Sequence, residues 1–176
     1  MSKNRGPQAM GMEQITKRGV LVADPSAHMA ALIGVMLRTI GRKDIREAYD
    51  ADRTMIELQR RPFDLLIIDM DLPRLDGVAF TRRLRSATDC RNRHIPIIMM
   101  SSTPEAKRIA DARDAGVTEF LRKPFAASHL QTRLDAIAAH PRCFIDNEDF
   151  KGPDRRRRVV AQSAAERRSV RLVQPS

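Results

Sequence analysis

The stretch LLIIDMDLPRLDG, residues 65–77, carries the strongest structural signal in the chain. It opens with an uninterrupted apolar run, and a run this short is typical of a fully buried strand. The run ends in Asp69, and a turn-forming sequence with Pro73 and Gly77 follows. In an open parallel sheet, the carboxyl ends of the strands face the ligand crevice. The stretch therefore predicts a central buried strand with Asp69 as a reactive group at its end.

Short apolar runs alternate with amphipathic helical patterns on both sides of this stretch. Further strands are expected at residues 20–23, 45–49, 95–100 and 117–122. Helices are expected near residues 29–40, 51–61, 78–85, 104–115 and 130–137, with Thr103 as the cap of the fourth. This alternation predicts an α/β fold, a (βα)5 doubly wound parallel sheet that is covered by helices on both faces.

Length and composition suit one domain with two extensions. We expect a flexible leader at residues 1–18, a domain at 19–140 and an arginine-rich tail at 141–176 that is largely disordered without a ligand. The two cysteines lack metal-ligand spacing, and no signal peptide or membrane-spanning run is apparent, so a reduced cytoplasmic protein without membrane insertion is expected. The net charge of +10 favours acidic or phosphorylated partners.

Polar residues follow four of the predicted strands and should meet at one rim of the sheet: Asp24, Asp69, Ser101 and Lys123. The segments LVADPS, LLIIDMDLPRLDG, IPIIMMSS and FLRKPF carry them in this order. On these motifs, residues 18–140 resemble the CheY-like receiver domain of two-component response regulators. The resemblance implies the flavodoxin-like receiver fold and a role in two-component signalling, such as a phosphorelay or chemotaxis.

The same resemblance assigns a phosphoryl acceptor and a metal site. It implies that Asp69 becomes phosphorylated by a histidine kinase or a phosphotransfer protein. It also implies a Mg²⁺ ion held by Asp24, Asp69 and Asp71, with Met70 or Asp71 offering a backbone carbonyl. The family usually has two consecutive acids after the first strand, but Pro25 stands in the second position here. This departure is expected to weaken Mg²⁺ binding.

The resemblance further assigns a cation and a switch. Lys123 would pair with the phosphoaspartate, and Ser101 would bind a phosphoryl oxygen and move inward on activation. Phe120 falls on the aromatic switch position of the family. Such a protein takes up a phosphoryl group on its own aspartate and is not a turnover enzyme. Its expected target is a protein, such as a flagellar motor or kinase component, and the tail is too short for a DNA-binding output domain.

The tail is rich in arginine rather than lysine. Seven arginines lie between Arg155 and Arg171, against the single acid Glu166. Arginine forms bidentate hydrogen bonds with phosphate and guanine and stacks on base planes, and Phe150 could add another stacking face. The layout resembles the Cle group of CheY-like proteins, which implies cyclic di-GMP as a ligand of Phe150, Arg155, Arg156, Arg157, Arg158, Arg167 and Arg168.

Other interpretations of these residues stay open. Asp24 would also serve as a helix cap, Asp71 as a turn former and Lys123 as a solvated loop residue. A degenerate receiver could act as a docking module whose basic tail binds nucleic acid or an acidic protein. Pro25 favours that alternative, whereas intact Asp69, Ser101 and Lys123 favour phosphorylation.

Overall fold

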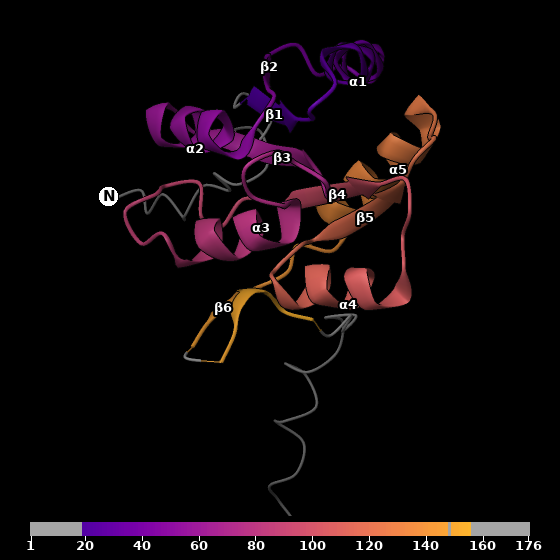
Figure 1. The fold of residues 1–176 in the computed structure, drawn as a ribbon. Coiled ribbons are helices and arrows are strands. Elements are labelled where there is room, and N and C mark those ends of the chain that lie inside the picture. The colour runs from indigo at the N-terminus through magenta and orange to yellow at the C-terminus, as the bar shows by residue number, and fades with distance from the viewer. Residues whose placement is uncertain (1–18, 148, 156–176) are drawn as a thin grey trace, which may run out of the picture.

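A five-stranded parallel sheet forms the centre of the molecule. The computed structural model describes residues 19–147 and 149–155. The elements in chain order are β1 (Gly19–Ala23), α1 (Ala27–Thr39), β2 (Ile45–Ala48), α2 (Ala51–Arg60), β3 (Phe63–Asp69), α3 (Gly77–Ser86), β4 (Ile97–Ser101), α4 (Ala106–Asp114), β5 (Glu119–Arg122), α5 (Ala127–Ala139), β6 (Phe144–Asp146) and β7 (Lys151–Pro153). The strand order of the main sheet is β2-β1-β3-β4-β5 (Figure 1). This arrangement confirms the predicted doubly wound α/β fold.

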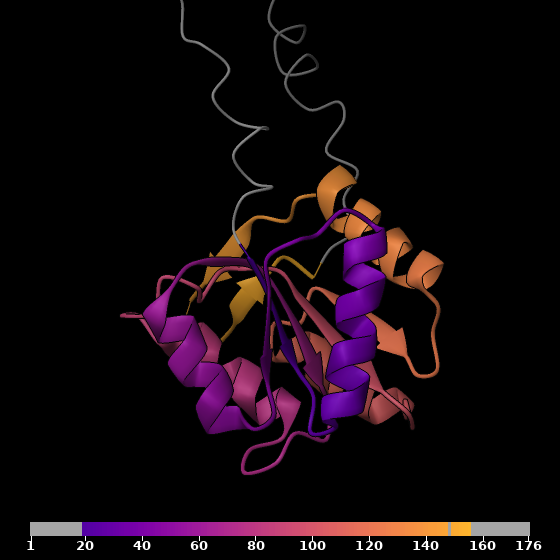
Figure 2. The same cartoon turned by 90° about the horizontal axis from the view of Figure 1, so that it is seen from above.

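Helices cover both faces of the sheet. Helices α1 and α5 lie next to each other over one face, whereas α2 and α3 lie over the other (Figure 2). The alternation of β3 explains this division, because Leu65 and Ile67 pack under α1 and α5 while Leu66 and Ile68 face the opposite side. All four of these side chains are almost fully excluded from solvent. A strand with both faces buried accounts for the continuous apolar run in the sequence.

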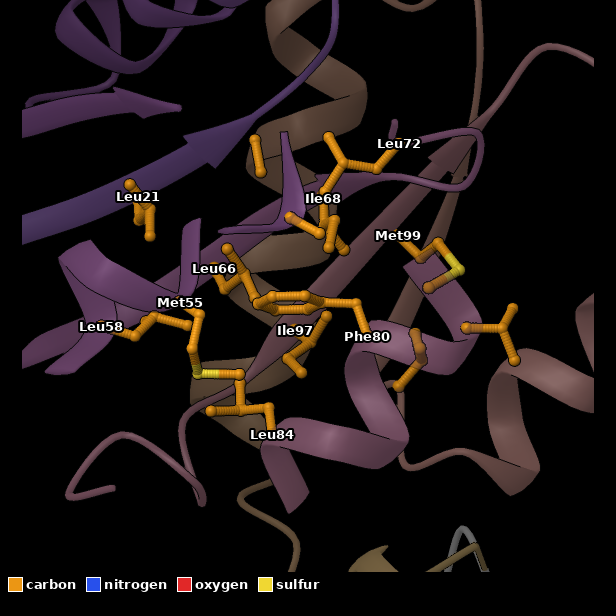
Figure 3. Packing of buried hydrophobic residues seen from close by; sticks show 14 of the residues in the cluster. Leu21, Met55, Leu58, Leu66, Ile68, Leu72, Phe80, Leu84, Ile97 and Met99 are labelled. Carbon is orange, nitrogen blue, oxygen red and sulfur yellow. The ribbon is translucent and has the colours of Figure 1, made fainter. Parts of the chain in front are cut away.

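The larger part of the core lies between the sheet and helices α2 and α3. Figure 3 shows the Phe80 ring of α3 at its centre, with Leu66 and Ile97 beside it. Met55 and Leu58 of α2 close the same layer. This packing fixes α3 against the end of β3, where the Asp69 loop begins. No helix in the described part of the chain is long and apolar enough to cross a membrane.

A small antiparallel hairpin follows α5. Strands β6 and β7 pair with each other, and this β6–β7 hairpin (residues 144–153) packs beside α3 (Figure 1). Gly152 lies so close to Gly116 that a Cβ at position 152 would sit 2.7 Å from the Gly116 Cα. Gly116 precedes β5, so the hairpin lies at the amino edge of the sheet, opposite the carboxyl ends of the strands.

The hairpin shows that part of the segment 141–176, for which the sequence predicts a largely disordered tail, is ordered. Residues 141–147 and 149–155 are folded onto the domain, and Phe150 is buried with 7% of its surface exposed. The chain buries these few apolar groups against the existing domain, which removes the need for a core of their own. The expectations for residues 1–18 and 156–176 lie outside the described residues.

Candidate functional site

The carboxyl ends of β1, β3, β4 and β5 bring the predicted site residues to one edge of the sheet. Asp24 directly follows β1, Asp69 and Ser101 end β3 and β4, and Lys123 directly follows β5. Asp24 and Asp69 are buried, with exposed fractions of 1% and 6%. These strands run parallel in the order β1-β3-β4-β5, so their carboxyl ends lie at the same edge of the sheet. Lys123 reaches Asp24 there although 99 positions separate the two residues along the chain.

Lys123 joins the two buried carboxylates. Its Nζ donates a hydrogen bond of 2.6 Å to Asp24 Oδ2 and another to Asp69 Oδ2. Burial alone would lower the pKa of Lys123, but the hydrogen bonds and charges of Asp24 and Asp69 outweigh it, and the net effect raises the pKa above 10.5. The ammonium therefore stays charged at neutral pH, and its stabilising contribution is lost only as the pH rises through this elevated value.

Backbone contacts orient both carboxylates. Asp69 Oδ1 accepts a 2.7 Å hydrogen bond from the Asp71 amide, and Asp24 Oδ1 accepts one of 2.8 Å from the Ser26 amide. The Gly77 amide donates to the Met70 carbonyl at 2.9 Å, which ties the start of α3 to the end of β3. A Cβ at Gly77 would lie 2.5 Å from the Asp69 carbonyl oxygen, so this position requires glycine.

The two predicted switch residues lie beside this cluster. Ser101 is fully buried, and its Oγ accepts a 3.2 Å hydrogen bond from the Thr103 amide. Phe120 is partly buried on β5, the edge strand of the sheet, and packs against the core. Thr103 does not cap α4, which corrects that prediction. The cap position is Glu105, which makes no side-chain capping hydrogen bond.

The described residues offer a small set of oxygen ligands for Mg²⁺. Asp24 and Asp69 supply two adjacent carboxylates, but the Asp71 carboxylate pairs with Arg108 of α4 at 2.6 Å. No group of three or more His, Cys, Asp or Glu side chains suited to a metal is present among the described residues. The Met70 carbonyl accepts a hydrogen bond from the Gly77 amide, which leaves the Asp71 carbonyl as the better backbone ligand for the metal. Two carboxylates and one carbonyl suit Mg²⁺, which retains several waters in protein sites.

The predicted ligand-binding residues of the tail are mostly outside the described residues. Arg156, Arg157, Arg158, Arg167 and Arg168 cannot be placed relative to the site, whereas Phe150 and Arg155 can. The Arg155 guanidinium lies 4.1 Å from the centroid of the Phe150 ring and pairs with Asp114 at 2.8 Å. Phe150 thus packs within the domain and is stacked by a residue of its own chain.

The sequence pattern did not indicate the structural roles of two arginines. Arg108 reaches the Asp71 carboxylate from α4, and Arg85 is fully buried beneath the β6–β7 hairpin. The helical spacing of α3 does place Arg85 on the same side as the buried residues Thr81 and Leu84, but arginine is usually solvent-exposed. No sequence signal specifies the partners of either side chain.

Replacing Lys123 with methionine is expected to destabilise the protein by about 1–3 kcal/mol near neutral pH. Asp24 and Asp69 would then face each other without a cation between them. Mg²⁺ should stabilise the variant more than the wild type, because the ion would supply the positive charge that the two carboxylates lack. Urea unfolding followed by circular dichroism measures these effects. The exposed neighbour Arg122, changed to methionine, is the control, and an equal loss in both variants would contradict the proposed bridge.

Comparisons with known proteins agree with this geometry. The sequence profile of the response regulator receiver domain matches residues 20–135. Chemotaxis protein CheY of Pseudomonas aeruginosa is 30% identical over 118 residues, which make up 67% of this chain and 94% of that protein. Chemotaxis protein CheY-3 of Vibrio cholerae is 28% identical over 128 residues, or 72% of this chain and 97% of that protein.

A solved structure is similar in the same region. The receiver domain of the sensor histidine kinase PA1611 from Pseudomonas aeruginosa has a magnesium ion coordinated in its active site cleft. It shares 26% sequence identity and a TM-score of 0.60 with this chain, and the match covers 68% of this chain and 95% of that one. The profile match covers well over half of the chain and includes all four strand-end residues. The protein therefore belongs to the response regulator receiver domain family, with a CheY-like receiver at residues 20–135.

Proposed function

We propose that this receiver accepts a phosphoryl group on Asp69 from a histidine kinase or a phosphotransfer protein. The observation that carries the proposal is the pairing of Lys123 with both Asp24 and Asp69 at the carboxyl edge of the sheet. A buried aspartate next to a charged lysine and a second carboxylate provides a nucleophile, a fixed cation and a metal ligand in one place. Isolated surface residues would not be held in this arrangement.

The chain supplies the groups that this transfer requires. A carboxylate oxygen of Asp69 forms the new O–P bond while the bond between phosphorus and the donor breaks, and the donor keeps that electron pair. The Asp71 amide and the Lys123 ammonium hold Asp69 in a fixed orientation. Lys123 also counters the negative charge on the transferred group. Asp24, Asp69 and the Asp71 carbonyl would hold Mg²⁺, which neutralises phosphoryl charge when bound.

The output of the receiver is a change in protein–protein contacts. Ser101 and Phe120 act as the switch, and the face formed by α4, β5 and α5 binds a target such as a flagellar motor or kinase component. Phe120 lies on the edge strand between these helices, which supports this choice of face. The protein carries its phosphoryl group as a signal and does not turn over a substrate.

Incubation of the full-length protein with acetyl phosphate and Mg²⁺ tests the proposal. Intact-mass spectrometry should show the addition of one phosphoryl group, and digestion should place it on the peptide that contains Asp69. Chelation of Mg²⁺ with EDTA should slow the labelling because the fixed cation, Lys123, supplies only part of the neutralising charge. The absence of label at any Mg²⁺ concentration would leave the docking-module alternative, which Pro25 favours.

We further propose that the arginine-rich segment binds cyclic di-GMP. Arg155 already pairs with Asp114 and stacks on Phe150, so binding rests chiefly on Arg156, Arg157, Arg158, Arg167 and Arg168. The planar guanidinium matches both the phosphates and the guanine edges of this ligand, and lysine lacks that geometry.

Calorimetry with a charge-matched variant tests the choice of ligand. Changing these five arginines to lysine in the full-length chain keeps the charge and removes the bidentate geometry. For cyclic di-GMP we expect an affinity loss of about tenfold or more. Equal binding by both proteins, or binding of any single-stranded nucleic acid with a steep salt dependence, would instead support nonspecific electrostatic binding.

A further inference from the structure

Helix α4 is held weakly by its own packing. Ala112 is its only buried residue within the helix bounds, and its cap residue Glu105 makes no side-chain capping hydrogen bond. By comparison, Asp76 caps α3 with bonds of 2.9 and 3.0 Å to the Val78 and Ala79 amides. A helix with so little buried surface can shift at small cost in free energy.

The amino-terminal half of α4 is connected to the Asp69 loop. Arg108 donates a 2.6 Å hydrogen bond to the Asp71 carboxylate. The Asp71 amide in turn donates to the Asp69 carboxylate at 2.7 Å. The position of Arg108 therefore depends on a residue that directly contacts the phosphoacceptor.

The carboxyl-terminal end of α4 is connected to the segment that follows the β6–β7 hairpin. Asp114, the last residue of the helix, pairs with Arg155 at 2.8 Å. Arg155 covers the Phe150 ring at 4.1 Å, and Phe150 directly precedes β7. The two ion pairs thus lie at opposite ends of one short helix.

We propose that α4 couples the chemical state of Asp69 to the docking of the β6–β7 hairpin through these two ion pairs. The proposal rests on the proposed phosphorylation of Asp69. Phosphorylation replaces the single carboxylate charge of Asp69 with an acyl phosphate of about two negative charges, a net addition of about one charge next to the Asp71–Arg108 pair. A guanidinium binds phosphate more strongly than a single carboxylate. Arg108 would then move toward Asp69 and take the start of α4 with it.

The direction of the coupling follows from the geometry. The helix spans about 13 Å and moves as a stiff body, so a shift at Arg108 also displaces Asp114. The Arg108–Asp71 and Asp114–Arg155 pairs are both formed when α4 lies where the structure places it. A movement of α4 toward Asp69 therefore breaks the contact at the other end. Arg155, which follows the hairpin and stacks on Phe150, is released from Asp114 when Asp69 is phosphorylated.

Hydrogen exchange with beryllofluoride, a stable mimic of the phosphoryl group, tests this coupling. In the full-length protein with Mg²⁺, amides of β6 and β7 should exchange about two- to fivefold faster when beryllofluoride is bound. Arg108→Gln should remove this response, whereas Lys107→Gln should retain it. Lys107 is exposed on the same helix and loses the same charge in the control.

A reciprocal measurement provides the second arm. Because coupling between two sites is mutual, Asp114→Asn should raise the affinity for beryllofluoride by about the same two- to fivefold factor. The charge-reversed pair Asp114→Arg with Arg155→Asp should restore the wild-type affinity. Fluorine NMR titration measures these affinities.

The outcomes separate the coupling from the proposed function. If beryllofluoride binds to the wild type and hairpin exchange is unchanged, the coupling is wrong while phosphorylation at Asp69 stands. If beryllofluoride and acetyl phosphate both fail to modify the wild type, the proposed function and the coupling are overturned together. Equal responses in Arg108→Gln and Lys107→Gln would also overturn the role of Arg108.

Discussion

An Asp69→Asn variant is expected to take up no phosphoryl group from acetyl phosphate. The amide oxygen of asparagine is a much weaker nucleophile than a carboxylate, so the O–P bond cannot form at this position. Asparagine has nearly the same shape, and its oxygen can still accept the Asp71 amide that now binds Asp69 Oδ1. Lys123 keeps its 2.6 Å bond to Asp24. The loss should therefore be one of chemistry and not of folding, and a thermal melt checks this distinction.

Asp71→Asn provides the matched control for this experiment. It is the same chemical change two residues away, at an exposed carboxylate that pairs with Arg108. Its backbone amide and carbonyl remain in place, so labelling at Asp69 should persist, although its rate can change. A label that survives in Asp69→Asn, or that disappears only in Asp71→Asn, would refute the assignment of Asp69 as the acceptor.

An Arg85→Ala variant is expected to lose about 3–5 kcal/mol of folding free energy. Arg85 is fully buried, and its Nε and Nη2 donate to the Gly116 carbonyl at 3.2 and 2.9 Å. Its Nη1 donates to the Arg93 carbonyl at 2.5 Å, and its guanidinium lies 5.6 Å from the centroid of the Phe144 ring. Alanine would leave a cavity and two unpaired carbonyls beneath the β6–β7 hairpin.

The charge of Arg85 is itself costly. Burial, with a smaller contribution from the nearby charge of Arg93, lowers the pKa of Arg85 to about 9. The guanidinium is still protonated at neutral pH. The free-energy cost of removing this charge from water is therefore offset by its three hydrogen bonds. Arg85→Met keeps most of the volume and removes the charge, and we expect it to lose only about 1–3 kcal/mol.

Chemical denaturation followed by circular dichroism measures both Arg85 variants. Arg83→Ala, at an exposed position in the last turn of the same helix, is the control and should change stability by less than about 0.5 kcal/mol. Hydrogen exchange should show the hairpin opening first in Arg85→Ala. A loss below about 1 kcal/mol for that variant would mean that the buried guanidinium does not hold the hairpin.

The sheet, and the edge of it that carries Asp24, Asp69 and Lys123, could be predicted from the sequence because each strand has a recognisable local pattern. The run at residues 65–68 lies within the observed β3, and the polar residues that follow β1, β3, β4 and β5 meet as the parallel topology requires. The contact between Lys123 and Asp24 follows from strand order once the family is recognised. The helix boundaries were predicted less well. The sequence predicts a helix from residue 104, whereas α4 begins at Ala106.

The hairpin and the two structural arginines could not be predicted because their partners are distant in sequence. Phe144 and Phe150 lie in a segment with too few apolar residues to suggest a core. Phe150 is buried and Phe144 partly buried only because the segment packs against α3, Gly116 and Arg85. The hydrogen bonds of Arg85 span 31 positions to Gly116. The local sequence pattern does not distinguish a buried arginine from an exposed one.

The placement of the β6–β7 hairpin has a practical consequence for the choice of domain boundaries. The family match ends at residue 135, and α5 ends at Ala139, so either position would be a natural point of truncation. A protein cut there would lose the strands that cover Arg85 and would expose the face of α3 that they now protect. Fragments meant to isolate the receiver should therefore extend through Arg155. In experiments on shorter fragments, the effect of removing the basic segment could not be distinguished from the effect of damaging the fold.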